Sequence, residues 1–261
     1  GTTTLQAQLA AQPGVFMSTP KEPNFFGDDA IYARGRDWYE SLFAEAPAGA
    51  LKGEASTHYT KLPTFPEAAR RLGEMLPEAR LIYLIRDPFD RLVSHYIHEW
   101  SMGEITLPLH EAVDAHPELV SYSLYAMQLE PYLTRFGRER IHIDRLERME
   151  RDPQGFLTDV GAFLGLDPSP VWRPDLHRVN ASSERIRRFP LRGVFVDNPV
   201  AATVRRTVVP RPVRDAVKRL FRKETRPTVP ADLRARLTPV FEADAAALEQ
   251  LTGSPASATA R

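Results

Sequence analysis

Residues 80–98 read RLIYLIRDPFDRLVSHYIH, in which a short apolar run is followed by a proline turn and then by an amphipathic pattern. The run LIYLI at 81–85 lies between charged residues, which is typical of a buried strand. Pro88 suits the first turn of a helix, and the apolar residues after it recur at helical spacing. The stretch therefore predicts a strand over 81–85, a sharp turn, and a helix over 88–100.

The same alternation extends along the rest of the chain. Further strand-like runs lie at 14–17, 50–53 and 140–143. Further helical patterns lie at 2–11, 35–44, 65–75, 121–136, 153–164 and 231–251. Strands that alternate with helices usually form a parallel sheet covered by those helices, so we predict an α/β fold. We see no internal repeat, and we expect residues 1–261 to form a single domain.

The composition limits what this domain can do. No apolar run reaches the roughly 18 residues of a membrane-spanning helix, and the first residues do not read as a secretion signal. We therefore expect a cytoplasmic protein with no membrane partner. The chain has no cysteine, which excludes disulfides and thiolate ligands, and its 7 histidines show no metal-ligand spacing. We expect no metal.

Basic residues gather toward the C-terminus, although the formal net charge is zero. Residues 171–228 hold 15 Arg or Lys against 5 Asp or Glu. No aromatic residues are interleaved with them in the manner of a nucleic-acid-binding motif, so we expect no nucleic-acid partner. We expect residues 191–261 to form a loop-rich basic extension with a closing helix.

Two stretches suit anion binding. The sequence GTTTL at 1–5 runs into the first helical pattern, where backbone N–H groups, the helix dipole and threonine hydroxyls would face an anion. The same sequence could equally form an ordinary helix N-cap that binds no ligand. Arg86 and Ser94 offer a guanidinium and a hydroxyl that suit a phosphate monoester, unless Arg86 pairs with Asp87 or Asp90. Two anion sites on one sheet indicate a doubly phosphorylated ligand.

Six motifs follow one another in the order found in sulfotransferases that use 3′-phosphoadenosine 5′-phosphosulfate (PAPS): GTTTL, KEPNFF, GRDWYESLF, GEAS, RDPFDRLVSHYIHEW and FLGLD. The set resembles most the heparan-sulfate sulfotransferase branch and its bacterial relatives, over roughly residues 1–190. The resemblance implies a P-loop-kinase-like parallel sheet flanked by helices on both faces. It also implies transfer of the sulfuryl group of PAPS to an acceptor hydroxyl, giving 3′-phosphoadenosine 5′-phosphate (PAP) and a sulfate ester.

The resemblance assigns four residues to the loop around the 5′-phosphosulfate, namely Gly1, Thr2, Thr3 and Thr4. It assigns Arg86 and Ser94 to the binding of the 3′-phosphate. In the family, a basic loop folds over the nucleotide, and Arg187 aligns best with the 3′-phosphate arginine of that loop, with Arg185 as the second choice. The family's loop also carries a lysine two places before its glycine. We expect that lysine and an upstream strand to precede Gly1 in the natural protein.

On the acceptor side, Glu22 of KEPNFF matches the carboxylate thought to deprotonate the acceptor hydroxyl in heparan-type enzymes. Partial burial would raise its pKa toward neutrality, whereas pairing with Lys21 would make it structural. Glu54 at another strand end is the alternative base, or it bonds its own turn. His98 matches a histidine that supports transfer in some relatives, although a packing role is equally open. Ala55 stands where that branch often has lysine, so the acceptor need not be heparan.

The sequence therefore predicts a PAPS-dependent sulfotransferase whose acceptor is a carbohydrate or a small-molecule biosynthetic intermediate. That acceptor would be carrier-tethered if the domain belongs to a larger enzyme. Two alternatives stay open: a catalytically silent nucleotide-binding or scaffold domain, and an ATP-dependent small-molecule kinase. Against the kinase, the sequence has no Gly-Lys-Ser/Thr element and no convincing Mg²⁺-binding acidic strand.

Overall fold

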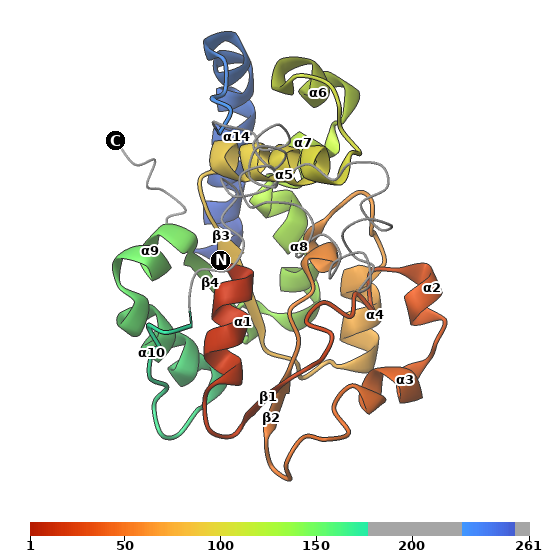
Figure 1. Cartoon of the computed structure of the whole chain (residues 1–261), viewed down its shortest axis with the longest axis vertical. Coiled ribbons are helices and arrows are strands. Elements are labelled where there is room, and N and C mark those ends of the chain that lie inside the picture. Colours follow the sequence, from red (N-terminus) through yellow and green to blue (C-terminus); the bar gives the residue numbers. More distant parts are fainter. Residues whose placement is uncertain (177–225, 254–261) are drawn as a thin grey trace, which may run out of the picture.

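In the computed structural model, which describes residues 1–176 and 226–253, four short strands lie among helices (Figure 1). The strands are β1 (Val15–Met17), β2 (Leu51–Gly53), β3 (Leu81–Ile85) and β4 (Ile141–Arg145). Each lies within two residues of a predicted apolar run, so the strand predictions are confirmed. The mixed α/β class is confirmed as well.

The strands pair in two parallel couples. Val15 of β1 lies opposite Leu51 of β2, and Leu81 of β3 lies opposite Ile141 of β4. The prediction of parallel pairing is confirmed, but the expected single sheet is corrected, because the described strands form two sheets of two strands. Backbones must approach to about 4.8 Å to pair, and within the described ranges no strand bridges β1–β2 and β3–β4.

The predicted long helices are confirmed with small shifts of their ends. The α-helices are α1 (Thr2–Ala10), α2 (Asp29–Tyr32), α3 (Arg36–Ser41), α4 (Ala68–Met75), α5 (Pro88–Met102), α6 (Leu109–Ala115), α7 (Glu118–Ser121), α8 (Tyr125–Phe136), α9 (Leu146–Arg151), α10 (Pro153–Leu164) and α14 (Ala231–Thr252). Two 3₁₀ helices are η1 (Thr57–Thr60) and η2 (Arg138–Arg140). The sequence missed α2, α6, α7 and α9, because four to seven residues are too few for a helical repeat to be visible.

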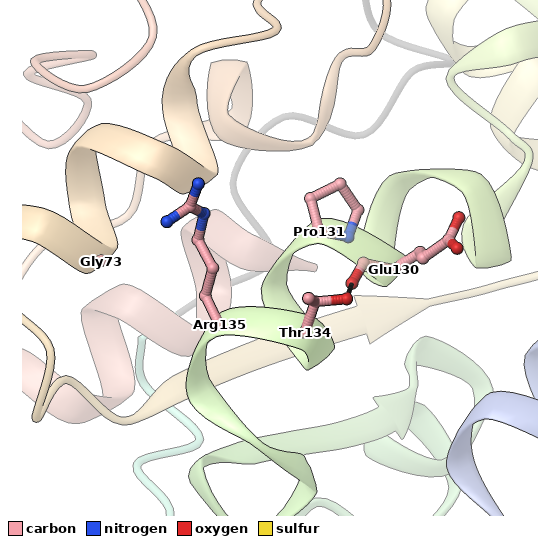
Figure 2. A pocket seen from close by; sticks show the side chains of 5 residues that line it. All are labelled: Gly73, Glu130, Pro131, Thr134 and Arg135. Carbon is pink, nitrogen blue, oxygen red and sulfur yellow. Dashed lines mark hydrogen bonds between the residues drawn. The ribbon is translucent and has the colours of Figure 1, made fainter.

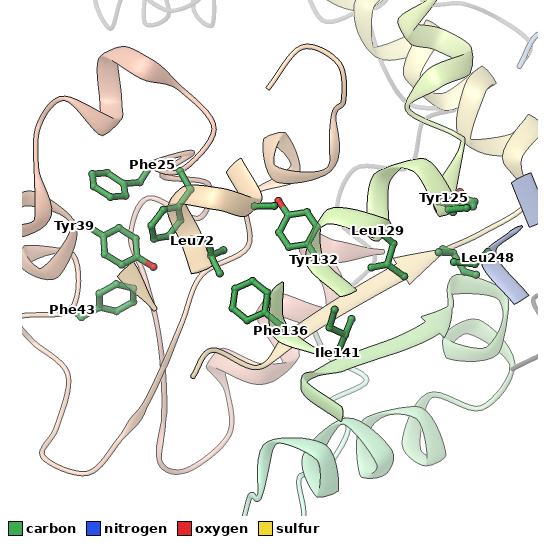
Figure 3. Close-up of a cluster of buried hydrophobic side chains, with 14 residues drawn as sticks. Phe25, Tyr39, Phe43, Leu72, Tyr125, Leu129, Tyr132, Phe136, Ile141 and Leu248 are labelled. Atoms are coloured by element: carbon green, nitrogen blue, oxygen red, sulfur yellow. The ribbon is translucent and has the colours of Figure 1, made fainter. Parts of the chain in front are cut away.

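One large core joins the two strand pairs. It runs from the aromatic rings of Phe25 and Tyr39, through Tyr132 and Phe136 of α8, to Leu248 of α14 (Figure 3). Phe25 stacks on Tyr39 with ring centroids 4.8 Å apart. Burial of large aromatic rings contributes strongly to such a core. The core therefore fixes the loop after β1, which carries Phe25, against α3 and α8.

The C-terminal helix α14 closes the described part of the fold. The Asp244 carboxylate accepts hydrogen bonds from the backbone N–H groups of Ala126 and Met127, at 3.1 and 3.3 Å. It thereby caps the first turn of α8, whose own N-cap residue provides no side-chain hydrogen bond. Among the described helices, none is long and apolar enough to cross a membrane.

Residues 170–173 run alongside α1 and α10 and are held by glutamine side chains. Gln12, which follows the end of α1, accepts from Val171 N–H at 2.9 Å and donates to its carbonyl at 3.0 Å. From α10, Gln154 accepts from Trp172 N–H at 2.9 Å and donates to the Pro170 carbonyl at 3.1 Å. These amides satisfy backbone groups that a neighbouring strand would otherwise satisfy. The segment thus has a fixed position beside α1.

Candidate functional site

The first helix begins beside the ends of β3 and β4. A Cβ atom on Gly1 would lie 2.8 Å from Leu146 Cδ1 and 3.5 Å from Leu84 Cδ1, so a larger residue would not fit without movement. The first turn of α1 has no acidic residue, and its N-cap makes no side-chain hydrogen bond. The first-turn N–H groups have no intrahelical acceptor, and they lie at the positive end of the helix dipole. This is the arrangement that anion binding at a helix start requires.

Arg86 follows Leu84 by two residues and so belongs to the same edge. Its Nη2 donates to the Asp90 carbonyl at 2.5 Å, and its backbone N–H donates to the Tyr125 hydroxyl at 3.3 Å. Burial lowers the pKa of Arg86, and the neighbouring charge of Arg226 adds to this. Asp87 and Asp90, the two carboxylates that could have paired with Arg86, have other partners. Asp87 caps α5 by accepting from the Asp90 N–H at 2.9 Å.

The Asp90 carboxylate pairs with Arg226 at 2.7 Å, so two arginines meet at this turn. No motif in the sequence indicates Arg226 as a site residue. Its position in the basic stretch 171–228 is the one signal that could have suggested it. Ser94 lies partly buried within α5. The predicted Arg185 and Arg187 lie outside the described residues.

The loop after β1 carries Glu22 and is anchored by its own aromatic residues. Phe25 and Phe26 are 0% exposed. Asn24 adopts a left-handed conformation with φ 54°, which asparagine tolerates better than most residues. Its N–H donates to Ser56 Oγ of the loop after β2 at 2.9 Å. The turn thus buries the two rings and leaves Glu22 at the carboxyl edge of the β1–β2 pair.

Both oxygens of Glu22 have partners. Lys21 Nζ lies 2.6 Å from Oε1, and Thr57 Oγ1 donates to Oε2 at 2.9 Å. Burial raises the pKa of Glu22, but the charge and hydrogen bond of Lys21 and the hydrogen bonds of Thr57 outweigh it and leave that pKa below its ordinary value. The expected rise toward neutrality is therefore wrong in direction. The pairing with Lys21 that the sequence left open is present.

Glu54 forms the centre of a buried hydroxyl network. Its Oε1 accepts from Tyr59 at 2.6 Å and Tyr39 at 3.3 Å, and its Oε2 accepts from Ser56 at 2.5 Å. Burial raises the pKa of Glu54 despite these hydrogen bonds, and the charge of Glu22 raises it further. The structure therefore brings the two predicted carboxylates close together. Glu54 ties α3 to the loop after β2, as its alternative structural role anticipated.

Helix α5 contributes one carboxylate and two histidines to the site. Glu99 Oε1 lies 3.2 Å from His95 Nε2 and 3.9 Å from His98 Nε2. The His98 side chain is 44% exposed, whereas His95 is largely buried. His58 stacks on Phe65 with centroids 4.6 Å apart, and burial lowers its pKa while the charge of Glu22 raises it. His58 thus lies near Glu22 and Glu99, and His98 lies beside Glu99 on α5.

A shallow hollow of about 630 Å³ lies elsewhere, between α4 and α8 (Figure 2). Its lining consists of Gly73, Glu130, Pro131, Thr134 and Arg135. None of these residues belongs to the strand ends or to the predicted motifs. Ligands of parallel α/β sheets bind at the carboxyl ends of the strands, so we place the site there and not in this hollow. No cluster of acidic and histidine side chains in the described ranges has the form of a metal site.

Comparison with known proteins agrees with this geometry. The family model described as "Sulfotransferase domain" matches residues 1–191. The chain belongs to the sulfotransferase family. The resemblance inferred from the six motifs is therefore confirmed, and family membership implies a transferase.

This sulfotransferase domain is similar to heparan sulfate glucosamine 3-O-sulfotransferase 6 of Homo sapiens, with 33% identity over 175 residues, or 64% of this chain and 49% of that protein. It is 31% identical over 176 residues to heparan sulfate glucosamine 3-O-sulfotransferase 3B1 of Mus musculus, covering 64% of this chain and 43% of that protein. The match thus spans less than half of each relative. Among solved structures, a sulfotransferase from Alicyclobacillus acidocaldarius matches with a TM-score of 0.66 and 25% identity, covering 97% of this chain and 91% of that one.

Proposed function

We propose that this domain transfers the sulfuryl group of PAPS to an acceptor hydroxyl, giving PAP and a sulfate ester. The observation that carries the proposal is the position of Gly1 against Leu84, because Arg86 follows Leu84 by two residues. The first-turn N–H groups of α1 and the Arg86 guanidinium therefore share one edge of the strands. A ligand with a phosphosulfate and a separate phosphate supplies an anion for each.

The first turn of α1 would bind the 5′-phosphosulfate through the N–H groups and hydroxyls of Thr2 and Thr3. Arg86 would bind the 3′-phosphate through its planar set of donors, aided by Ser94 and the second cation, Arg226. The described contacts give Arg86 no carboxylate partner, which fits an arginine that binds a ligand anion. Arg185 and Arg187 remain proposed contacts from outside the described residues.

We propose Glu22 as the general base. In the transfer, the acceptor oxygen forms a bond to sulfur, the bond from sulfur to the PAP phosphate oxygen breaks, and its electron pair stays on PAP. The acceptor proton passes to the Glu22 carboxylate, which Lys21 and Thr57 hold in place. Because its pKa is lowered, Glu22 is ionised and able to accept a proton at neutral pH. His98 would stabilise the sulfuryl oxygens, and Glu54 would keep the loop in position.

We also propose that a strand preceding Gly1, with the lysine expected upstream, lies between β2 and β3. Leu51 on β2 is 37% exposed, and the apolar residues 81–84 of β3 are only partly buried. A strand between them would cover these side chains and join the two pairs into one parallel sheet.

Titration calorimetry with PAP tests the nucleotide site. We expect submillimolar binding by the wild type, a loss of at least tenfold in Arg86→Ala, and little competition by ATP. Arg70→Ala is the matched control, because Arg70 pairs with Glu67 and Glu74 on the outer face of α4. Equal affinity in Arg86→Ala and Arg70→Ala would contradict the site, and equal competition by ATP would favour the kinase alternative.

A further inference from the structure

Arg91 of α5 is a partly buried cation, and one of its donor atoms lacks an acceptor among the described residues. Its Nη1 atom is fully buried and has no hydrogen-bond partner within the described ranges. Its guanidinium carbon lies 5.7 Å from the ring centroid of Tyr122, a contact that stabilises a cation only modestly at this distance. A buried charged donor without an acceptor is unfavourable. The position therefore suits an anion that is not part of the described chain.

Lys61 approaches the same ring from the loop after η1. Its Nζ lies 5.8 Å from the Tyr122 centroid, and no carboxylate of the described residues lies within ion-pair distance of it. The buried Gln128 fixes this loop, because it accepts from Leu62 N–H at 2.7 Å and donates to the Leu62 carbonyl at 3.0 Å. Lys61 is thus held in place without a charge partner of its own.

His95 completes the group around Tyr122. Its ring stacks on Tyr122 with centroids 5.1 Å apart, and its Nδ1 is buried without a hydrogen-bond partner in the described part of the chain. Its Nε2 is engaged by Glu99 at 3.2 Å. Three polar groups, Arg91 Nη1, Lys61 Nζ and His95 Nδ1, therefore belong to side chains around one aromatic ring. Neither Nη1 nor Nδ1 has a hydrogen-bond partner among the described residues.

Three carboxylates lie in this region, and each has another partner. Glu22 lies 2.6 Å from Lys21, Glu99 lies 3.2 Å from His95, and Glu118 lies 3.2 Å from His116. In the described part of the chain, none of them lies within ion-pair distance of Lys61 or Arg91. The charges of both Glu99 and Glu22 raise the pKa of Lys61, although burial lowers it more, so Lys61 lies close to the candidate base.

We propose that Lys61 and Arg91, around Tyr122, form an anion subsite that seats one acidic group of the acceptor, a carboxylate or a sulfate ester, while the hydroxyl of that acceptor faces Glu22. The inference rests on the proposed function and adds a substrate class to it: a hydroxyl compound that carries a single buried negative charge. Its two cations come from different elements and approach one ring, so it recognises one acidic group by position as well as by charge.

The first test uses inorganic sulfate as the probe, with the protein saturated with PAP so that the phosphate sites are filled. Proton NMR follows the C2–H resonances of the histidines, and that of His95 is assigned with His95→Gln. We expect a saturable shift of the His95 resonance. Lys61→Met should weaken sulfate binding at least tenfold, whereas Lys61→Arg and Lys52→Met, an exposed lysine on β2, should retain it.

A second arm distinguishes an organic acid from free sulfate. Methyl β-glucuronide and methyl β-glucoside differ by one carboxylate, and only the glucuronide should displace sulfate from the His95 resonance. A non-saturable shift, an equal response in Lys61→Met, or equal displacement by both sugars would overturn the subsite. PAP affinity, measured on the same samples, separates this outcome from failure of the nucleotide site. It should be unchanged in Lys61→Met.

Discussion

The side-chain amide of Gln8 pairs with the backbone of Arg173 across 165 positions of sequence. Its Nε2 donates to the Arg173 carbonyl at 2.8 Å, and its Oε1 accepts from the Arg173 N–H at 2.8 Å. Gln8 is 0% exposed. Together with Gln12, which follows the end of α1, it holds residues 171–173 as a neighbouring strand would. The helix that begins at the proposed phosphosulfate site is therefore joined directly to the start of the basic stretch.

Gln8→Leu should destabilise the fold by roughly 2–4 kcal/mol, because a buried N–H and a buried carbonyl each lose a partner. Urea unfolding followed by circular dichroism measures the change. Gln6→Leu is the matched control on the same helix, since Gln6 is only partly buried. Equal stability of the two variants would show that the amide pairing contributes nothing.

Glu22→Gln should reduce sulfuryl transfer at least a hundredfold and leave PAP affinity within twofold, because the change removes only the proton acceptor. Transfer is measured as PAP release from PAPS in the presence of the acceptor. Glu54→Gln should instead lower the melting temperature, since an amide N–H₂ group would oppose hydroxyl donors such as Tyr59 and Ser56. If Glu54→Gln stopped transfer without a loss of stability, Glu54 would be the base.

Arg226→Ala should weaken PAP binding about threefold to tenfold, because it removes the second cation beside Arg86 and frees the Asp90 carboxylate. The loss should be larger at low salt than at high salt, because the contact is solvent-exposed. Arg236→Ala is the control, since Arg236 of α14 forms a solvent-exposed pair with Asp114 of α6 at 2.7 Å. Equal affinities of the two variants would remove Arg226 from the site.

The sequence predicts the elements of this fold better than their assembly. The apolar run at 81–85 defines β3, and Pro88 defines the start of α5. Both elements could therefore be recognised from residues adjacent in the sequence. The division into two strand pairs depends on backbone contacts between distant segments, which no local pattern encodes. The pairing of Gln8 with Arg173 is invisible for the same reason, since a glutamine in a helix reads as a surface residue.

For the site, the motifs located Glu22 and Arg86 but not their surroundings. Lys21 is adjacent in sequence, so its pairing with Glu22 could be raised as an alternative, whereas Thr57 comes from another loop. The direction of the Glu22 pKa shift could not be predicted, because it depends on these partners outweighing burial. Lys61 belongs to no motif, and Arg91 lies within RDPFDRLVSHYIHEW without a role assigned to it. Only their shared approach to Tyr122 distinguishes them from other basic residues.

Stability should fall as the pH is lowered below about 6.5, because burial lowers the pKa values of His58 and His95 below that of a free histidine. Between the lowered folded pKa and the ordinary value of 6.5, the unfolded chain binds more protons than the folded one, so acid favours unfolding. Glu22 and Glu99 change the stability at a lower pH than the histidines do. Their lowered pKa values give stability that is present above the ordinary value of 4.5 and is lost as the pH falls through the folded pKa.

The two windows can be separated by measuring the free energy of unfolding in urea at intervals from pH 8 to pH 4. His95→Gln should flatten the profile just below pH 6.5. It should also reduce, but not abolish, the loss below pH 4.5, because Glu99 loses the hydrogen bond and charge of His95 whereas Glu22 keeps Lys21 and Thr57. His110→Gln, a change at an exposed histidine of α6, should leave both windows as in the wild type. If the profile of His95→Gln matched that of the wild type above pH 5, the buried imidazole would not be the group that titrates there.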